Sequence, residues 1–391
     1  MSNKQSKIFI LGGLTGGPLV PLLAISKKLK NVDPIILGVK NSFESKYCND
    51  NNLDICYLPK AKLNLLSFKN QTFLEIVFGL LDLFSSFFKL AWSFVIATYL
   101  LFKYKPKLIL SSGSFLSVPI FWSAKIWKTL GLINAKLILH QQDPEPGLAN
   151  KLTIKIADYS TCAFEYTKNN YKSFKNSVLI PNPIDYTKFD SSNNSDGYNN
   201  LDIKNLELKK FLDKIDNNQI NKPILLIFGG GSGASFINQW VWDNLDQLLE
   251  NNFVIHLSGN QLDKSIRSNQ DYLLLEALTS DMPVALVRAN RVICRAGIST
   301  ITELNYLDKK AFIVPIPGSH QELNARLASS KFSILEQKNA DKWLNQINSL
   351  EYKPVTVFAD KVKAEFMFRL NPDDIKLQLD NHYQILNNLI N

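Results

Sequence analysis

Two stretches of the chain repeat the same order of apolar run, glycine-rich turn and amphipathic helix. The first covers residues 7–29, KIFILGGLTGGPLVPLLAISKKL, and the second covers residues 224–249, ILLIFGGGSGASFINQWVWDNLDQLL. Each pattern is typical of the start of a Rossmann-like unit, in which the exposed helix N-terminus offers backbone N–H groups to an anion. Because the two stretches lie in opposite halves of the chain, they predict two domains that face each other rather than one sheet.

Short apolar runs rich in β-branched residues continue the pattern in both halves. Stretches with helical character separate them, and this alternation predicts parallel sheets. The expected further strands are residues 34–39, 107–113 and 135–143 in the first half, and residues 253–259, 283–287, 291–297 and 311–317 in the second.

Breaks in the apolar pattern suggest where the domains begin and end. The boundary follows Pro181-Asn182-Pro183, and the polar tract SSNNSDGYNN (191–200) is a linker or surface-insertion candidate. These breaks define four segments. We expect a first domain at residues 1–184, a linker or insertion at 185–221, a second domain at 222–358, and a helical segment at 359–391 that packs back on the first domain.

Residues 73–102 form the longest apolar stretch and carry only three charges, at Glu75, Asp82 and Lys89. Charges seven residues apart form one narrow polar stripe on a helix. A buried core helix is one interpretation, and a bilayer-spanning helix would have to place Asp82 and Lys89 inside the membrane. The favoured interpretation is a monotopic helix that lies in the membrane interface.

The net charge of +9 is concentrated in the same part of the chain. Residues 1–110 hold 14 lysines and 6 acidic residues, which gives +8. Lysines flank the apolar stretch on both sides, where they could meet anionic headgroups. No zinc-finger, RNP or basic-helix pattern accompanies them, so the charge does not favour nucleic acid as a partner. The flanking lysines are Lys60, Lys62, Lys69, Lys103, Lys105 and Lys107.

Composition excludes several classes of protein. A chain of 391 residues with 46% hydrophobic and 20% charged residues is typical of globular domains, not of disorder or a multi-span membrane protein. The four cysteines are widely spaced, with no CxxC pair, which suits a reducing cytosol and makes a structural zinc site unexpected. The first residues lack the h-region of a secretory signal.

The second glycine loop, residues 229–234, can be aligned with GxGxxA, but the rest of a dinucleotide site is missing. An NAD site needs an acid at the end of the next strand, and here that strand ends in His256-Leu257-Ser258-Gly259-Asn260. Neither glycine loop is followed by GKS or GKT. The sequence therefore disfavours dinucleotide and ATP binding.

Two polar clusters follow later strands of the second half. In residues 294–303, Thr300 and Glu303 have capping-box spacing, so the segment could simply begin a helix. Alternatively, that helix N-terminus is aimed at a diphosphate, with Glu303 one turn in and able to accept ribose hydroxyls. The other cluster, residues 315–325, lies where the carboxyl edge of a parallel sheet usually binds ligands.

Several short motifs occur in a fixed order along the chain. Those of the first half are Thr15-Gly16-Gly17 with Pro21, Ser112-Gly113-Ser114-Phe115 with Pro119, His140-Gln141-Gln142-Asp143 with residues 147–151, and Asn182-Pro183. Those of the second half are residues 229–234 with Asn238-Gln239, residues 295–303, and His320-Gln321 with Asn324-Ala325. Together they resemble the MurG family of N-acetylglucosaminyltransferases over nearly the whole chain.

The resemblance implies a GT-B fold, an α/β fold in which two Rossmann-like domains face each other across a cleft and parallel sheets are flanked by helices. It implies transfer of GlcNAc from UDP-GlcNAc to a lipid-linked acceptor, lipid I to lipid II, at the cytoplasmic side of the cell membrane by a peripheral enzyme. We expect no cofactor and no metal, since no DxD-type ligand pair is evident.

The resemblance also assigns candidate binding residues. For the UDP-sugar they are Thr15, Gly16, Gly17, Asp143, Gly230, Gly231, Ser232, Gly233, Thr279, Arg295, Gly297, Thr300, Glu303, His320, Gln321 and Asn324. For the acceptor and the membrane they are Gly113, Phe115, Lys69 and Trp92.

The departures from the family pattern fall on the expected chemistry. The family's first loop ends in a histidine that is a leading candidate for general base, and Pro18 stands at that position. The acid of the family's HEQN motif is Gln141, and its asparagine is Asp143. The arginine expected after the Asn182-Pro183 hinge is also absent, since Ile184-Asp185 follows.

Inverting sugar transfer needs a base for the acceptor hydroxyl and stabilisation of the departing UDP. Helix N-termini and Arg295 can supply the stabilisation. Asp143, Glu145 and His140 are the candidate bases, and we favour Asp143 because it opens a post-strand loop. Asp143-Pro144 is equally a common turn starter, and His140 equally a structural histidine.

Three functions remain open from the sequence. The first is a divergent lipid II-forming enzyme with a shifted base. The second is a related lipid glycosyltransferase with another glycolipid acceptor, and the third is a non-catalytic nucleotide-sugar-binding membrane scaffold. Glu303, Gln321 and the glycine loops favour an enzyme, because a scaffold needs no donor site.

Overall fold

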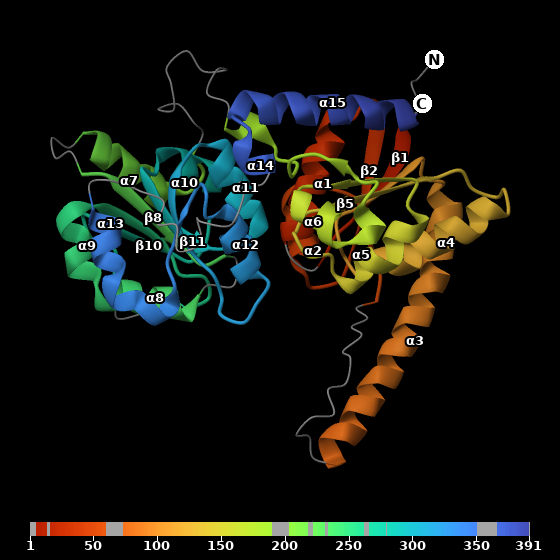
Figure 1. Ribbon diagram of the computed structural model, residues 1–391, viewed down its shortest axis with the longest axis horizontal. Coiled ribbons are helices and arrows are strands. Elements are labelled where there is room, and N and C mark those ends of the chain that lie inside the picture. The colour runs from red at the N-terminus through yellow and green to blue at the C-terminus, as the bar shows by residue number, and fades with distance from the viewer. Residues whose placement is uncertain are drawn as a thin grey trace. The chain divides into compact units, whose positions relative to one another are not determined.

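A computed structural model divides the chain into two compact units (Figure 1). The first unit comprises residues 1–184 and 377–391, and the second comprises residues 185–376. The structure describes residues 5–13, 16–59, 73–189, 203–217, 222–230, 234–261, 266–278, 280–349 and 366–390. Several predicted positions lie outside these ranges: Thr15, Lys60, Lys62, Lys69, the tract 191–200, Gly231, Ser232, Gly233 and Thr279.

The first unit is built on a parallel sheet with the strand order β3-β2-β1-β4-β5-β6-β7. Its central strands are buried on both faces, which is why they consist of nearly continuous apolar residues. The strands are β1 (Ser6–Leu11), β2 (Val32–Gly38), β3 (Ile55–Tyr57), β4 (Leu108–Ser111), β5 (Lys136–Gln141), β6 (Tyr159–Cys162) and β7 (Val178–Leu179). The helices are α1 (Gly16–Lys28), α2 (Phe43–Asp50), α3 (Phe73–Tyr104), α4 (Ser117–Thr129), α5 (Leu148–Thr153) and α6 (Glu165–Asn170).

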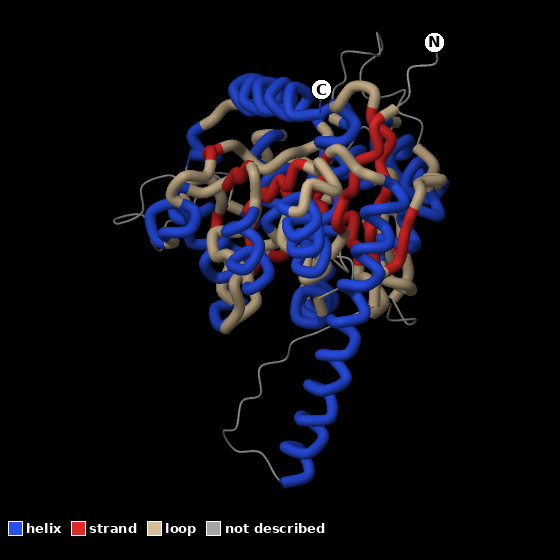
Figure 2. The backbone as a smooth tube through the Cα atoms, turned by 90° about the vertical axis from the view of Figure 1, so that its right-hand side faces the viewer, coloured by secondary structure: helices blue, strands red, loops and turns tan. Residues whose placement is uncertain are grey.

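The second unit repeats the plan with the strand order β10-β9-β8-β11-β12-β13, again parallel. Figure 2 marks the strands of the chain in red among the blue helices. Its strands are β8 (Ile224–Phe228), β9 (Phe253–Leu257), β10 (Tyr272–Leu275), β11 (Arg291–Arg295), β12 (Lys310–Val314) and β13 (Ser333–Ile334). Its helices are α7 (Leu206–Asp216), α8 (Ser235–Asp243), α9 (Leu245–Asn251), α10 (Met282–Arg288), α11 (Ile298–Tyr306), α12 (Gln321–Ala328), α13 (Trp343–Asn348) and α14 (Phe366–Arg369). The last helix, α15 (Pro372–Ile390), places residues from Leu377 onward in the first unit.

One predicted strand is wrong. Residues 283–287 belong to helix α10, which begins at Met282 and ends at Arg288. Pro283 stands in the first turn of this helix. Residues of the first turn donate no hydrogen bond within the helix, so the missing N–H of proline costs nothing there, and its fixed φ suits the helix. Val284, Ala285 and Leu286 are buried, so their apolar run reflects helix packing and not a strand.

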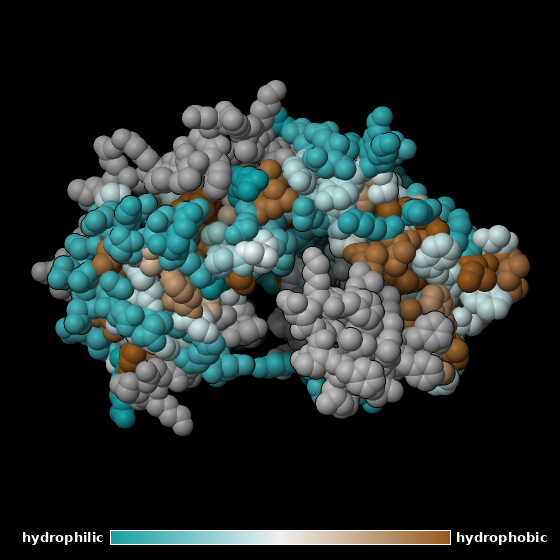
Figure 3. Space-filling view, turned by 60° about the horizontal axis from the view of Figure 1, so that its bottom comes forward, coloured by the Kyte–Doolittle hydropathy of each residue, from teal (hydrophilic) through white to brown (hydrophobic). Residues whose placement is uncertain are grey.

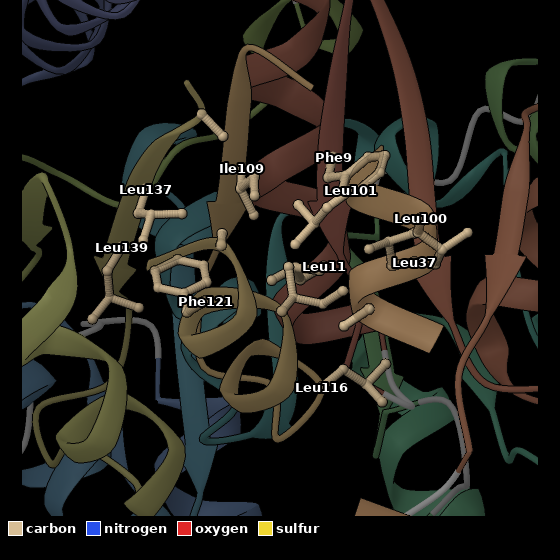
Figure 4. Close-up of a cluster of buried hydrophobic side chains, with 14 of the residues drawn as sticks. Phe9, Leu11, Leu37, Leu100, Leu101, Ile109, Leu116, Phe121, Leu137 and Leu139 are labelled. Atoms are coloured by element: carbon tan, nitrogen blue, oxygen red, sulfur yellow. The ribbon is translucent and has the colours of Figure 1, made fainter. Parts of the chain in front are cut away.

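The long apolar stretch is helix α3, and its last turns belong to the core of the first unit. Ala97, Leu100 and Leu101 are buried against strand residues such as Phe9 and Leu37 (Figure 4). The other end of α3 extends away from the sheet (Figure 1). Within the part of the chain that the structure describes, no helix is both long enough and apolar enough to traverse a bilayer.

Candidate donor site

The sheet of the second unit reverses its winding between β8 and β11. These strands are hydrogen-bonded neighbours, yet the chain leaves β8 towards β9 on one side and leaves β11 towards β12 on the other. In open parallel sheets, such a switch point leaves a crevice at the carboxyl ends of the strands, where ligands bind. The sequence candidates Gly230, Arg295, Gly297, Thr300 and Glu303 all lie at this edge or in the helix that follows it.

Helices α8 and α11 begin at the switch point, one after each of the two strands. Their N-cap residues are Ala234 and Gly297, and no side chain of the described residues caps either helix. Gly230, in the loop before α8, has a φ of 95°, a conformation that strongly favours glycine. Helix starts without a side-chain cap among the described residues can offer their first N–H groups to an anion.

The capping-box interpretation of Thr300 and Glu303 is wrong. The N-cap of α11 is Gly297, so Thr300 is already the third residue of the helix. A glycine N-cap has no side chain with which to satisfy the terminal donors. The geometry therefore fits the alternative expectation, a helix start that leaves its N–H groups to a ligand.

Glu303 lies one turn into α11 and is half-buried. Burial raises the pKa of its carboxyl to about 7, and the positive charge of Lys188 acts in the opposite direction. A carboxylate at this position can accept hydrogen bonds from paired hydroxyl groups such as those of a ribose. Near neutral pH, its protonation state is therefore sensitive to what binds beside it.

Arg295 ends β11 and points its guanidinium at the end of β12. Its Nη1 donates to the carbonyl oxygens of Val314 at 3.3 Å and Pro315 at 3.4 Å. Burial lowers the pKa of the guanidinium. Arg295 therefore ties the loop after β12 to the switch point and brings a positive charge to this edge of the sheet.

The polar cluster of residues 315–325 supports the loop that precedes α11. Asn324 is buried, and its Nδ2 donates to the carbonyl oxygen of Ala296 at 3.1 Å. Gln321 turns back on its own loop, where its Oε1 accepts from the backbone N–H of Ile316 at 3.3 Å. His320 is exposed just before α12. Of the three, Asn324 therefore contacts the switch-point loop directly.

A buried polar network contacts the first turns of α8 through Asn238. His256 on β9 contacts Asn238 Oδ1 through Nε2 at 3.1 Å and the Tyr272 hydroxyl through Nδ1 at 2.9 Å. Because the amide oxygen can only accept, Nε2 carries the proton and Nδ1 accepts from tyrosine. Burial lowers the pKa of His256 to about 4, which keeps the ring neutral.

The sequence left His140 of the first unit as either a candidate base or a structural histidine, and its contacts are those of a structural histidine. The imidazole is 2% exposed, with Nε2 at 2.8 Å from Asn182 Oδ1 and Nδ1 at 2.8 Å from Thr161 Oγ1. Burial lowers its pKa to about 4. Both ring nitrogens are thus engaged inside the protein, and the geometry does not favour His140 as a base.

Asp143 and Glu145 lie in the loop that follows β5, at the carboxyl edge of the first sheet. Asp143 is half-buried, whereas Glu145 is exposed. Gly113, in the loop after the neighbouring strand β4, has a φ of 122°. Phe115 in the same loop is half-buried, and Trp92 on α3 is 59% exposed. Gly17 lies in the first turn of α1, after the first glycine loop.

Sequence reasoning missed Glu44, Gln141 and Asn150 as residues that shape this edge. Glu44, in the first turn of α2, is buried against Gly12, where a Cβ would come 2.5 Å from Glu44 Cγ. Its position just after the second strand was the available signal, since that is also the ligand edge of the sheet. Gln141 Nε2 donates to the carbonyl oxygens of Asp143 and Glu145 in the loop after β5, and Asn150 Nδ2 donates to Gln141 Oε1.

No cluster of three or more histidine, cysteine or acidic side chains that could hold a metal occurs among the described residues. The donor edge instead presents helix N-termini, Arg295 and Glu303. This combination can hold a diphosphate through N–H groups and a ribose through a carboxylate.

Comparisons with known proteins agree with this geometry. The glycosyltransferase family 28 N-terminal domain matches residues 8–160, and the C-terminal domain of the same family matches residues 224–365. A UDP-N-acetylglucosamine–N-acetylmuramyl-(pentapeptide) pyrophosphoryl-undecaprenol N-acetylglucosamine transferase of Borreliella burgdorferi is 31% identical, over 85% of this chain and 83% of that protein. The protein of the same name from Clostridium novyi is 30% identical, over 88% and 90%.

Solved structures share the fold at lower identity. MurG of Acinetobacter baumannii superposes with a TM-score of 0.61 at 18% identity, covering 98% of this chain and 99% of that chain. A UDP-GlcNAc 2-epimerase from Neisseria meningitidis, bound to UDP-GlcNAc, gives 0.55 at 14% identity, covering 98% and 99%. The expected GT-B class, with two parallel sheets flanked by helices, is confirmed. The chain belongs to glycosyltransferase family 28.

Proposed function

We propose that this chain is an inverting glycosyltransferase that transfers GlcNAc from UDP-GlcNAc to a lipid-linked MurNAc-pentapeptide, converting lipid I to lipid II. The relatives that share about 30% of its residues carry the name of this activity. The observation that carries the proposal is the switch point of the second unit, where α11 begins without a side-chain cap and Glu303 follows one turn later.

The donor is held by three kinds of contact. The N–H groups at the starts of α8 and α11 receive the diphosphate, and the Glu303 carboxylate receives the ribose hydroxyls. As the bond to the sugar breaks, negative charge grows on the leaving diphosphate. Oriented N–H groups and the nearby Arg295 stabilise that charge, so the proposed mechanism uses no metal and no cofactor.

The acceptor hydroxyl requires a base, and we assign this role to Asp143, with Glu145 as the alternative in the same loop. Both carboxyl groups belong to the loop after β5, at the ligand edge of the first sheet. Pro18 cannot take a proton, and His140 is held by Thr161 and Asn182. Of the two, Asp143 is half-buried and Glu145 is exposed, so Asp143 is the more shielded from solvent.

We further propose that helix α3 binds the cytoplasmic face of the membrane. Phe88, Trp92, Val95, Tyr99 and Phe102 follow at steps of four and three, so they share one face, and each is at least 37% exposed. This row, named the α3 stripe, lies opposite the face that contributes Ala97 and Leu101 to the core.

Helix α4 continues the apolar surface beside the α3 stripe. Phe102 packs edge-on against Trp127 at 5.2 Å between ring centroids, and Ile126 is 50% exposed. Between the two helices lies a groove of about 340 Å³ lined mainly by apolar side chains. Brown patches of hydrophobic residues lie on the right-hand side of Figure 3, the side of the first unit. Lys103, Lys105 and Lys107 are exposed at the end of α3, where they can meet anionic headgroups.

Calorimetric titration of the full chain with nucleotide sugars tests the donor half of the proposal. We expect UDP-GlcNAc to bind with micromolar to submillimolar affinity, and UDP to compete with it. GDP- and ADP-sugars should bind much more weakly, because the proposed site belongs to a UDP-sugar enzyme. No detectable binding of UDP-GlcNAc would contradict the assignment.

A further inference from the structure

The loop that follows β5 is held in place by side chains that donate hydrogen bonds to its backbone carbonyl groups. Gln142 O accepts from Asn182 Nδ2 at 3.3 Å, and Asp143 O accepts from Gln141 Nε2 at 2.7 Å. Pro144 O accepts from Thr167 Oγ1 at 2.8 Å, and Glu145 O accepts from Gln141 Nε2 at 3.3 Å. Four consecutive carbonyls are therefore satisfied by side chains, although the loop belongs to no helix or sheet.

Gln141 makes two of these four bonds and is itself anchored. Its side chain is 2% exposed, and its Oε1 accepts a hydrogen bond from Asn150 Nδ2 in α5. Asn150 is equally buried and also lies against Gly113, where a Cβ would come 3.1 Å from Asn150 Nδ2. The contact ties the loop after β5 to the loop after β4, because both pack on the same asparagine.

An amide is the one side-chain group of this size that fits these partners. Two carbonyl oxygens need two N–H donors, and the Asn150 amide nitrogen needs an acceptor, which together describe a primary amide. A carboxylate at position 141 would face two carbonyl oxygens with no proton to share, and a buried polar group without its partner is costly. The glutamate of the related family motif would therefore not support this loop conformation.

We infer that Gln141 is a positioning residue that sets the loop carrying Asp143 and Glu145 in the geometry needed for acceptor activation. Its role in the reaction rests on the proposed function. The loop side chains need no contact with Gln141 for this role, because Gln141 acts on the backbone between them. With the carbonyls turned inward, Asp143 and Glu145 are held on a backbone that does not have to reorganise when the acceptor binds.

The test compares the wild-type protein with Gln141→Glu, which keeps the shape of the side chain. The introduced carboxyl group has one hydrogen-bond donor when it is protonated and none when it is ionised, whereas the glutamine amide has two. Hydrogen exchange at the four backbone N–H groups of residues 142–147, where positions 144 and 146 are proline, measures the loop directly and needs no activity. At pH 8 we expect faster exchange in this loop and unchanged exchange in the second unit. The matched control is Gln384→Glu, which makes the same charge change on the exposed face of α15.

Kinetics of the same variants provide the second measurement. For Gln141→Glu at pH 8 we expect kcat to fall about 10- to 100-fold, while KM for UDP-GlcNAc stays unchanged. As the pH is lowered towards 5.5, the introduced carboxyl regains a proton and one donor, so the deficit relative to wild type shrinks. His140, Asp143 and Glu145 are present in both proteins. A pH dependence of kcat that appears only in Gln141→Glu therefore comes from the introduced carboxyl group.

Thr167→Val keeps the inference testable if Gln141→Glu fails to fold. This change removes only the bond to Pro144 O and preserves the shape of the side chain. Faster exchange in residues 142–147 together with a lower kcat supports the inference. Wild-type exchange and wild-type kcat in a folded Gln141→Glu protein, or in Thr167→Val if the former does not fold, would overturn it. If the wild-type protein transfers no sugar, the proposed function fails, and the exchange data alone decide whether Gln141 fixes the loop.

Discussion

The side-chain amide of Asn324 donates to the carbonyl oxygen of Ala296 at 3.1 Å, joining the helix after β12 to the loop that precedes α11. Both groups are buried. Ala296 directly precedes Gly297, the N-cap of the helix whose N–H groups we assign to the donor diphosphate. The position of these N–H groups therefore depends on a side chain that does not itself have to touch the donor.

Replacing Asn324 with alanine should weaken donor binding through the backbone. We expect a loss of about 1–2 kcal/mol in the free energy of unfolding and an increase of about fivefold to tenfold in Kd for UDP-GlcNAc. Asn252→Ala is the matched control, because Asn252 is also buried and donates to a backbone carbonyl, that of Leu248, just before β9. An equal loss of affinity in both variants would show a general effect of stability.

Glu303→Ala should raise the Kd for UDP-GlcNAc about 10- to 100-fold, the worth of hydrogen bonds to a charged group. The fold should persist, since removing a carboxyl whose pKa is raised by burial relieves a desolvation cost. Calorimetry measures the affinity, and thermal unfolding checks the fold. Unchanged affinity would remove Glu303 from the donor site.

The pH dependence of donor binding follows from the same residue. With a pKa of about 7 in the free protein, Glu303 loses its acceptor charge as the pH falls. If the carboxylate form binds the ribose, affinity should drop about tenfold from pH 8 to pH 6, as expected for one linked proton. Glu303→Gln should flatten this profile. A wild-type profile that is already flat would contradict the assigned role.

Asp143→Asn should lower kcat by about 10²- to 10⁴-fold while leaving donor affinity close to that of the wild type, because only proton removal is lost. Glu145→Gln is the companion variant from the same loop. Initial rates at saturating UDP-GlcNAc measure the effect. Full activity of Asp143→Asn with a large loss in Glu145→Gln would move the base to Glu145.

The buried histidines predict sensitivity to acid. Burial lowers the pKa of both His140 and His256 to about 4. The unfolded chain binds these protons near pH 6.5, so the stability from the neutral rings is complete above that pH and is lost as the pH falls towards 4. Each site accounts for about 3 kcal/mol by pH 4. The urea midpoint should fall over this range, and less steeply in His256→Gln than in the control His320→Gln, whose histidine is exposed.

The α3 stripe predicts membrane binding that needs apolar contact. Combining Trp92→Asp with Val95→Asp should weaken sedimentation with vesicles containing phosphatidylglycerol by about 10- to 100-fold. Leu206→Asp removes an equally exposed leucine from α7 in the second unit and should have no effect. Equal binding of all three proteins would refute the assignment of α3 to the membrane.

Apolar runs predicted strands β2, β4, β5, β9, β11 and β12, because strands buried on both faces must be apolar throughout. The same rule failed for residues 283–287, where Pro283 and three buried residues belong to a helix. Short edge strands such as β7 and β13 have too few residues to form a recognisable pattern. Their positions after predicted strands indicated that the donor candidates lie at the carboxyl edge of the second sheet, and their role in binding stays a prediction.

The interactions within the sites were beyond sequence reasoning. The sequence pattern identifies Gln141 only as a position where the family's acid is missing. In the structure, its side-chain amide donates hydrogen bonds to the backbone carbonyls of Asp143 and Glu145 and accepts one from Asn150. His140 meets Asn182 from a segment 42 residues away. Which side chains meet across such separations depends on sheet order and packing, and neither periodicity nor local spacing carries that information.

Transfer of labelled GlcNAc from UDP-GlcNAc tests the central claim most directly. The purified protein is given lipid I, a diacylglycerol glycolipid or a polyprenyl-phosphate sugar as acceptor, with Glu303→Ala as the reference for weakened donor binding. We predict label in lipid II with lipid I, little or none with the other acceptors, and a rate with Glu303→Ala reduced at least tenfold at limiting donor. Efficient transfer to another glycolipid but not to lipid I, or no transfer to any acceptor despite donor binding, would contradict the account.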